Sequence, residues 1–498
     1  MSVRPRARDT LTVLVVALVA RLLVVAWAAP RFPPAADGTF YHRIAERIAE
    51  GLGYTWLWPD GVVTYAAHYP VGYPGLVGAA YAIAGPRPGA AMILNALVGA
   101  LAAVAVHRLA ARAAPRGPAL AAGLAVALHP GLVAYTPALM SEGVTAALVA
   151  CGAWAAGWVR DAIEDVSRRG LPWGRLAVLG LVIGAATLVR PQSLLLAPLL
   201  ALLALAVPGR PHALRSALLG AALASVTALA VCAPWTLRNC VRMKHCALVS
   251  VNGGWNLLIG ADPVSTGAWS PVKVPDECRE VYDEAQKDVC FGRAARRYIA
   301  TNPGPWLSLV PRKLAATFDY CGAAGWYLHD ANGAACDDEC KVSLGAVETI
   351  YERLMLLFAL VWASRSLWAE LYGARRASGG KGVRLRLVLS PLQLARIAAF
   401  VVGVVFLFQV HAWVSYVAFV VLAALRGREL LRGPVLPAAA AGVLVATIAT
   451  HAVFFGAGRY SLVVFPLLSG VAALAFVKLR PDPEPSPPAS GAGEAPRL

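Results

Sequence analysis

The sequence predicts an all-α polytopic membrane protein. Of its 498 residues, 58% are hydrophobic and only 15% are charged, and the mean hydropathy is +0.60. A chain of this composition is solvated mainly by lipid. Apolar runs long enough to cross a hydrocarbon core about 30 Å thick recur along it. We distinguish about twelve such spans, at residues 11–29, 90–111, 118–136, 141–159, 174–189, 192–208, 214–233, 346–364, 390–408, 410–425, 434–455 and 460–477.

Three of these runs allow a second interpretation. The first, at 11–29, is longer than the apolar core of a cleaved signal peptide, so we expect it to remain as an anchor. The pair between 390 and 425 can also be interpreted as one long tilted helix, which leaves the number of spans open at that point.

The basic residues predict the orientation of the spans. The net charge is +17, but residues 234–345 hold 12 Lys and Arg and 12 Asp and Glu, so the excess lies elsewhere. Short basic connectors of membrane proteins remain in the cytoplasm. The charge is therefore explained without a nucleic-acid partner, and we expect both termini inside a bacterial-type inner (plasma) membrane and two large loops, 30–89 and 234–345, outside. The basic connectors are at 4–8, 108–116, 166–170, 373–386 and 426–432.

These spans and loops suggest four segments. Residues 1–233 form an N-terminal transmembrane catalytic module that includes the outer loop 30–89. Residues 234–345 form a small extracytoplasmic domain that contains most of the cysteines, and 346–480 form a C-terminal transmembrane module. The Pro-rich tail, 481–498, is predicted to be disordered.

Cysteine usage agrees with this orientation. Seven of the nine cysteines lie in the second outer loop, where an oxidising compartment permits disulfides. Local bridges from Cys278 to Cys290 and from Cys336 to Cys340 fit the spacing, and the odd number leaves one thiol unpaired. A zinc site is the alternative, but this loop has no CxxC pair and its histidines do not follow finger-like spacing.

The first outer loop begins with a predicted interfacial helix. Phe40, Ile44 and Ile48 recur at helical spacing, with charged residues between them. Asp37 starts this helix at the outer membrane boundary, either as a candidate general base or as the N-cap of the helix. Further on, residues 67–85 are too short to cross and either re-enter the membrane or lie flat. His68, Tyr69 and Tyr73 then face the same compartment as Asp37.

Other charged residues are predicted at the same face. Glu142 lies where the third span turns into the fourth, Arg190 between the fifth and sixth, Arg238 at the exit of the seventh, and Arg459 before the last. A carboxylate so close to hydrocarbon is costly unless it is paired or hydrated. Each arginine alone fits a membrane anchor. Together they suggest an anionic ligand such as a phosphate, to which guanidinium groups form bidentate bonds.

At this point the motifs resemble a known family. They are D-x-x-x-Y from Asp37 to Tyr41, P-x-G-Y-P at 70–74, the acidic Glu142, L-x-R-P at 188–191, P-W-x-x-R-N at 234–239, NGGWNLLIG at 252–260 and R-Y-x-x-x-x-x-P at 459–466. In this order, over residues 10–480, they are similar to those of the GT-C polytopic glycosyltransferases. Within that class they resemble the dolichyl-phosphate-mannose-protein mannosyltransferases and aminoarabinose transferases.

The resemblance implies a GT-C fold and an activity. The expected enzyme transfers a sugar, with inversion, from a polyprenyl-phosphate donor to an acceptor at the outer face of the membrane. Asp37 and Glu142 would be catalytic. Arg459, Tyr460, Arg190 and Arg238 would bind the donor phosphate, and Tyr41, His68, Tyr69, Asn252, Trp255 and Asn256 would bind acceptor or sugar.

The chain also departs from the family pattern. Relatives often have a Glu after the first Asp, where this chain has Gly38, and the late motif places its proline further from the tyrosine. No residue is assigned to a metal, but a divalent ion at Glu142 remains a candidate. The donor sugar and the acceptor, which can be a protein, a lipid or a glycan, are left open.

Two other functions are consistent with parts of the pattern. A lipid-linked oligosaccharide ligase or polymerase also uses outer-loop arginines, but with an oligosaccharide diphosphate lipid as donor. A transporter or flippase requires charges near the membrane midplane and favours an internal repeat with broken helices. The sequence shows the informative charges at one face, and its two halves differ in loop length.

Overall fold

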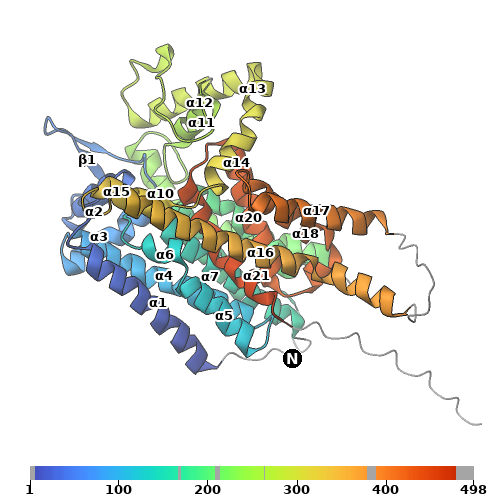
Figure 1. Cartoon of the computed structure of the whole chain (residues 1–498). Coiled ribbons are helices and arrows are strands. Elements are labelled where there is room, and N and C mark those ends of the chain that lie inside the picture. Colours follow the sequence, from blue (N-terminus) through green and yellow to red (C-terminus); the bar gives the residue numbers. More distant parts are fainter. Residues whose placement is uncertain (1–5, 166–169, 208–212, 263, 378–388, 478–498) are drawn as a thin grey trace, which may run out of the picture.

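The structure is almost entirely helical. The computed structural model describes residues 6–165, 170–207, 213–262, 264–377 and 389–477. Within these residues the only sheet is a two-stranded hairpin, and the long helices pack side by side into a bundle (Figure 1). The predicted all-α polytopic class is confirmed. The predicted disordered tail and most of the basic connectors 166–170 and 373–386 lie outside the described residues.

The N-terminal part contains the first long helices and the first outer loop. The long helices are α1 (Ala7–Ala28), α4 (Pro88–Ala110), α5 (Arg116–Ala127) followed by the short α6 (Pro130–Ala134), and α7 (Ser141–Glu164). Between α1 and α4 lie α2 (Asp37–Ala49), the antiparallel strands β1 (Thr55–Leu57) and β2 (Val63–Tyr65), and α3 (Gly72–Ala84). The 13 residues of α3 are too few to cross a bilayer.

The next helices lead into the second outer loop. They are α8 (Trp173–Val189), the 3-10 helix η1 (Pro191–Leu195), α9 (Leu196–Leu205) and α10 (Ala213–Arg242). The domain boundary predicted after residue 233 falls inside α10, which continues through Pro234 without a break. The division of the chain into domains therefore remains a prediction.

Short helices form the second outer loop. They are α11 (Gly253–Ala261), the 3-10 helix η2 (Asp276–Cys278), α12 (Glu284–Thr301), α13 (Pro303–Ser308), α14 (Val310–Phe318) and α15 (Ala323–Ala331). Figure 1 shows α11 to α13 as a cap at one end of the bundle. The cap has a small core of its own, which contains Leu258, Cys278 and Phe291.

Disulfides hold this loop. The two predicted local bridges, Cys278–Cys290 and Cys336–Cys340, are confirmed, and a third joins Cys240 to Cys246. Cys321 is the thiol left over in the loop, and it is buried.

The C-terminal part returns through the bundle. It consists of α16 (Asp338–Ala377), α17 (Pro391–Leu407), α18 (Trp413–Leu425), α19 (Arg428–Arg432), α20 (Val435–Val453), the 3-10 helix η3 (Gly458–Val463) and α21 (Phe465–Leu474). The stretch 390–425 forms two helices, α17 and α18, which pack against each other.

The spans themselves are confirmed only in part. Each predicted apolar run coincides with a helix or with a 3-10 helix that continues into one. Among the described residues, 6 helices are long and apolar enough to cross a membrane. The protein is thus a multi-pass membrane protein, whereas the count of twelve crossings remains a prediction.

Candidate active site

The site begins at the first turn of α2. Pro33 and Pro34 lie just before it, and proline disfavours a helical conformation in the residue that precedes it. Ala36 has a φ of 47°, a region that side chains rarely adopt and that is found most often at functional sites. Ala36 occupies the N-cap position, and Asp37 is the first helical residue. The alternative interpretation of Asp37 as the N-cap is therefore wrong.

The Asp37 carboxylate instead points to two side chains from distant elements. Its Oδ1 accepts a hydrogen bond from the Tyr69 hydroxyl at 3.1 Å. Its Oδ2 lies 2.9 Å from Nη2 of Arg459, in the first turn of η3. Residues 37 and 459, at opposite ends of the sequence, thus form one ion pair.

Glu142, in the first turn of α7, is the second carboxylate of the site. Its Oε1 is 2.6 Å from Nη2 of Arg190 and 3.2 Å from Nε of Arg459, and its Oε2 accepts a bond from the Tyr135 hydroxyl at 3.3 Å. The Glu142 side chain is 1% exposed, whereas that of Asp37 is 31% exposed. Glu142 is therefore enclosed by its partners, and only Asp37 is open to a substrate.

The guanidinium groups of Arg190 and Arg459 both lie over the ring of Tyr460. The guanidinium carbons of Arg190 and Arg459 lie 4.7 and 5.3 Å from the centre of its ring, within the range of cation–π attraction. His451 stacks on the same ring with the centroids 4.5 Å apart. These contacts fix both arginines beside Glu142.

A small pocket of about 40 Å³ opens next to Arg190 and Tyr460. One part of its wall is polar and the other is apolar. The polar part contains Arg190, Gln192, Ser193, Thr450, His451 and Tyr460, and the apolar part contains Val149, Leu196, Val443 and Val463. A wall of this kind suits a ligand with an anionic head and a hydrocarbon tail.

A lysine of the second outer loop binds the end of the helix that precedes Arg459. Lys313, on α14, donates to the carbonyl oxygens of Ala452 and Val453 at 3.3 and 3.1 Å. These are among the last carbonyl groups of α20, which a cation near a helix C-terminus stabilises. The N-terminal part of α14 is thereby bound to the C-terminal end of α20, which precedes η3 in the chain.

Aromatic residues line the approach to Asp37. The Tyr69 ring packs edge to face against Tyr41 and His68, with centroids 5.0 and 4.9 Å apart. Burial, reinforced by the nearby Asp37 carboxylate, raises the pKa of Tyr41 and of Tyr69, so both hydroxyls stay protonated. Burial lowers the pKa of His68, which favours its neutral form. The predicted group of Tyr41, His68 and Tyr69 is therefore brought together beside Asp37.

The NGGWNLLIG motif lies further out. It forms the N-cap and nearly all of α11, and the Trp255 ring meets His68 edge to face at 5.5 Å. Asn252 precedes α11, where its Oδ1 accepts a bond from Ser250 at 2.9 Å, and Asn256 lies within the helix. Of the three residues in this motif that were predicted to bind acceptor or sugar, Trp255 alone connects through His68 to the aromatic group.

Arg238 is the one predicted phosphate-binding residue that the structure does not bring to the cluster. Its guanidinium donates to the carbonyl oxygens of Ala66 and Tyr54 at 2.7 and 2.8 Å. It also lies over the ring of Trp235. Arg238 thus holds the backbone of the first outer loop, and we remove it from the expected phosphate-binding group.

The carboxylates do not form a ready metal site. Within the described ranges, no group of three or more His, Cys, Asp and Glu side chains could hold an ion. Asp37 and Glu142 already share Arg459, and Glu142 also pairs with Arg190. A divalent ion would have to displace these guanidinium groups, so the donor set does not fit one.

Two features were missed by the motif patterns. Tyr135 and Tyr327 contact the site or its loops, but a single tyrosine outside a motif carries no sequence signal. A second polar group, also buried, is formed by His129, Glu352 and Tyr416, with His129 Nε2 3.2 Å from Glu352. The transporter alternative would need ionisable groups buried in this way, and the sequence pattern did not reveal them.

With this geometry established, relatives can be compared. Residues 68–237, about a third of the chain, match the model of the dolichyl-phosphate-mannose-protein mannosyltransferase family. The predicted family resemblance is confirmed. The matched segment contains His68, Glu142 and Arg190, whereas Asp37 and Arg459 lie outside it. No curated protein matches the chain.

Solved structures resemble the chain over most of its length. The archaeal oligosaccharyltransferase AglB from Archaeoglobus fulgidus, in complex with an inhibitory peptide and a dolichol-phosphate, is 15% identical, with 94% of this chain and 50% of that chain covered and a TM-score of 0.45. ArnT from Cupriavidus metallidurans in the apo state is 16% identical, with 93% and 76% covered and a TM-score of 0.39. The chain therefore spans about half the length of AglB.

Proposed function

We propose that the protein is a membrane glycosyltransferase that moves a sugar from a polyprenyl-phosphate donor to an acceptor hydroxyl, with inversion. The observation that carries the proposal is the shared ion pair in which Arg459 bridges the exposed Asp37 and the enclosed Glu142, with Arg190 beside it. An acid–base group and two phosphate-binding cations are what this displacement needs. The family match supports the same class of reaction.

The arginines bind the donor phosphate in this proposal. The pocket beside Arg190 and Tyr460 has polar and apolar walls, which suit the phosphate and the start of the polyprenyl chain respectively. Guanidinium groups form strong charge-assisted bonds to phosphate. An incoming phosphate competes with Asp37 for Arg459, so donor binding releases the Asp37 carboxylate for catalysis.

Asp37 then acts as the general base. It accepts the proton of the acceptor hydroxyl while the acceptor oxygen forms a bond to the anomeric carbon. The bond from that carbon to the phosphate oxygen breaks, and the electron pair leaves with the phosphate. Arg190 and Arg459 stabilise the charge that develops on the leaving group. Tyr41, His68, Tyr69 and Trp255 line the approach from which the acceptor or sugar enters.

We infer that this chemistry takes place on the extracytoplasmic face, with both termini in the cytoplasm. The three disulfides lie in the loop that packs over the site, and disulfides persist in oxidising compartments. The described basic connectors, 108–116 and 426–432, follow the opposite ends of α4 and α18, and basic connectors favour the cytoplasm. An inner-membrane protein of this orientation takes its donor from the outer leaflet.

The test is a transfer assay with purified protein in liposomes. Radiolabelled polyprenyl-phosphate mannose, glucose and arabinose are each incubated with an envelope extract as acceptor. Asp37→Asn should lower kcat by about 10²- to 10⁴-fold, the usual contribution of a general base. It should leave donor binding, followed by native mass spectrometry with polyprenyl phosphate, intact. Asp60→Asn is the matched control, because Asp60 is exposed on the hairpin of the same outer loop.

Three outcomes would contradict the proposal. Full transfer by Asp37→Asn would exclude Asp37 as the base. Transfer only from a polyprenyl-diphosphate oligosaccharide would instead favour a ligase or polymerase. Uptake of a solute into sealed vesicles without a covalent product would favour a transporter.

A further inference from the structure

The Tyr327 hydroxyl joins the two loops that carry the carboxylates. Tyr327 lies on α15, in the second outer loop, and its side chain is buried. Its oxygen accepts a hydrogen bond from the backbone N–H of Ala35 at 3.3 Å and another from that of Leu139 at 3.1 Å. Ala35 lies two residues before Asp37, and Leu139 three residues before Glu142. One hydroxyl therefore contacts the backbone directly upstream of both acidic residues.

Gly38 makes this close approach possible. A Cβ atom at residue 38 would lie 2.9 Å from the Tyr327 oxygen and 3.0 Å from the Leu139 carbonyl oxygen. Both distances are at or below the shortest that side chains tolerate, so a larger residue would push the two loops apart. The departure from the family pattern at residue 38 thus has a structural reason, because the Tyr327 hydroxyl occupies the space of the missing side chain.

The backbone between these contacts is strained. Ala36 has a φ of 47°, and a non-glycine residue keeps such a conformation only when its surroundings impose it. The bond from Ala35 to Tyr327 lies directly before it. On the N-terminal side, Asn332 Nδ2 donates to the Arg31 carbonyl oxygen at 2.8 Å. Helix α15 and the residues that follow it therefore hold the segment before Asp37 at two points.

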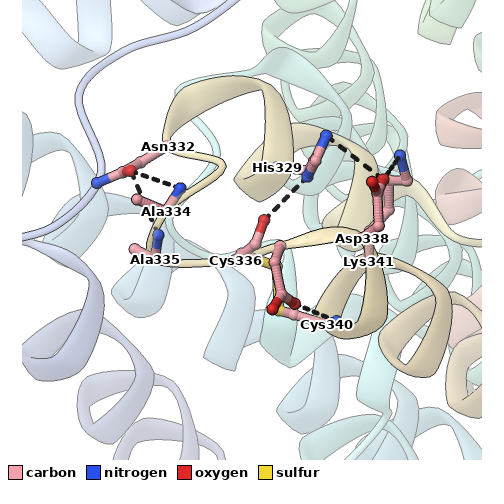
Figure 2. Close-up of a disulfide and its surroundings, with 9 residues drawn as sticks. His329, Asn332, Ala334, Ala335, Cys336, Asp338, Cys340 and Lys341 are labelled. Atoms are coloured by element: carbon pink, nitrogen blue, oxygen red, sulfur yellow. Dashed lines mark hydrogen bonds and ion pairs between the residues drawn. A yellow bond between two sulfur atoms is a disulfide. The ribbon is translucent and has the colours of Figure 1, made fainter.

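The end of α15 is itself anchored. Figure 2 shows the Cys336–Cys340 disulfide, which joins the loop after α15 to the start of α16. His329 Nδ1 lies 3.0 Å from the Cys336 carbonyl oxygen, and Asn332 Oδ1 accepts from Ala334 and Ala335 in the same turn (Figure 2). These contacts fix the position of Asn332 relative to Tyr327.

We propose that Tyr327 is a positioning residue that sets the separation between Asp37 and the group of Glu142, Arg190 and Arg459. The inference rests on the proposed function, because it assigns Tyr327 a role in the geometry of the same site. Tyr327 does not touch the reacting atoms. It acts through the backbone of residues 35 and 139, so that an element of the second outer loop completes the active site.

The test removes only the hydroxyl, by Tyr327→Phe. The first readout is amide hydrogen exchange, which does not depend on any reaction. Exchange at Ala35 and Leu139 should become roughly 3- to 10-fold faster, as expected for the loss of one hydrogen bond each. Tyr351→Phe is the matched control, because the Tyr351 hydroxyl also bonds a backbone group, the Ala125 carbonyl, away from these loops.

The second readout is transfer kinetics. Tyr327→Phe should lower kcat by about 10- to 100-fold, the range for a misplacement of the order of 1 Å, while the KM for the donor changes less than about twofold. Gly38→Ala should lower kcat in the wild type and should lower it several-fold less in Tyr327→Phe, because the nearest of the three atoms that the new methyl group meets is then gone. A general loss of packing would not produce this coupling.

The two proposals fail in different ways. Unchanged exchange at Ala35 and Leu139, or faster exchange with unchanged kcat, would overturn the role of Tyr327. Independent, additive effects of the substitutions at 38 and 327 would also overturn it. A wild-type protein that transfers no sugar would refute the proposed function, while the exchange measurement would still decide whether Tyr327 holds the loops.

Discussion

Glu142 and Asp37 are chemically alike but differ in their surroundings. Glu142 is 1% exposed and contacts both arginines and Tyr135, whereas Asp37 remains open on one side. A buried charge whose partner is removed is strongly destabilising, whereas a half-exposed ion pair contributes little. The environment therefore divides the two carboxylates into a structural group, Glu142, and a group available for chemistry, Asp37.

This difference predicts the effect of Glu142→Gln on stability. The change keeps the shape of the side chain but leaves Arg190 and Arg459 without their shared counter-charge. We expect a loss of about 2–3 kcal/mol in the free energy of unfolding, less than for a fully buried pair because the arginines are partly exposed. Thermal unfolding in detergent measures it. Asp37→Asn is the comparison and should cost under about 1 kcal/mol; equal losses would contradict the assignment.

Some residues of the site could be predicted from the sequence and others could not. Asp37, Glu142, Arg190 and Arg459 are charged groups at span ends, and the cost of charge near lipid restricts where such residues can lie. Arg238 meets the same criterion but bonds to the backbone of Ala66 and Tyr54, and its partners cannot be read from one stretch of sequence. Tyr327 was missed because its role depends on backbone groups that are far away in the chain.

At the scale of elements, the NGG motif has a packing role. A Cβ atom at Gly254 would lie 1.9 Å from the carbonyl oxygen of Asp288 on α12, so α11 and α12 cross with almost no space between their backbones. Asn252 is the N-cap of α11, and Gly253 and Gly254 form its first turn.

Gly254→Val should therefore destabilise the outer cap. The added side chain must separate α11 from α12, which typically costs about 1–3 kcal/mol, and it should shift Trp255 away from His68. Gly253→Val is the matched control, since a Cβ there meets nothing within 4 Å. Limited proteolysis of the cap measures the effect. Equal protease resistance of the two variants would show that the crossing does not require a glycine.

The boundaries of elements were predicted less well than their existence. Apolar runs identify where a helix must lie, because lipid leaves the backbone few other ways to satisfy its hydrogen bonds. They do not indicate where the helix ends, since α10 and α16 continue into polar sequence beyond their apolar parts. The β1–β2 hairpin was not predicted, because its strands are only three residues long.

At the scale of the whole molecule, the orientation in the membrane can be tested directly. Asp60→Cys places a thiol on the exposed hairpin of the first outer loop, and Arg428→Cys places one on the exposed start of α19 in a basic connector. A membrane-impermeant maleimide should label residue 60 in intact spheroplasts but residue 428 only after permeabilisation, because basic connectors stay inside. The reverse pattern would place the site in the cytoplasm.

The native cysteines should give little background in this experiment. Cys232 and Cys321 are buried, Cys151 is half-buried on α7, and the other six are paired in disulfides. Labelling of the unmodified protein, before and after permeabilisation, is the control. It also checks that the three bridges form in the membrane-embedded protein.

Because Tyr327 lies late in the chain, it is synthesised after the two loops that it binds. A ribosome delivers the segments around residues 35 and 139 well before residue 327, whose loop must still be exported and form its disulfides before the Tyr327 hydroxyl can reach them. Until then the nascent chain contains Asp37, Glu142 and Arg190, but it lacks the two hydrogen bonds through which Tyr327 connects the loops of the two carboxylates. We expect the newly made protein to reach its full rate of transfer only after both the second outer loop and the turn that carries Arg459 have folded.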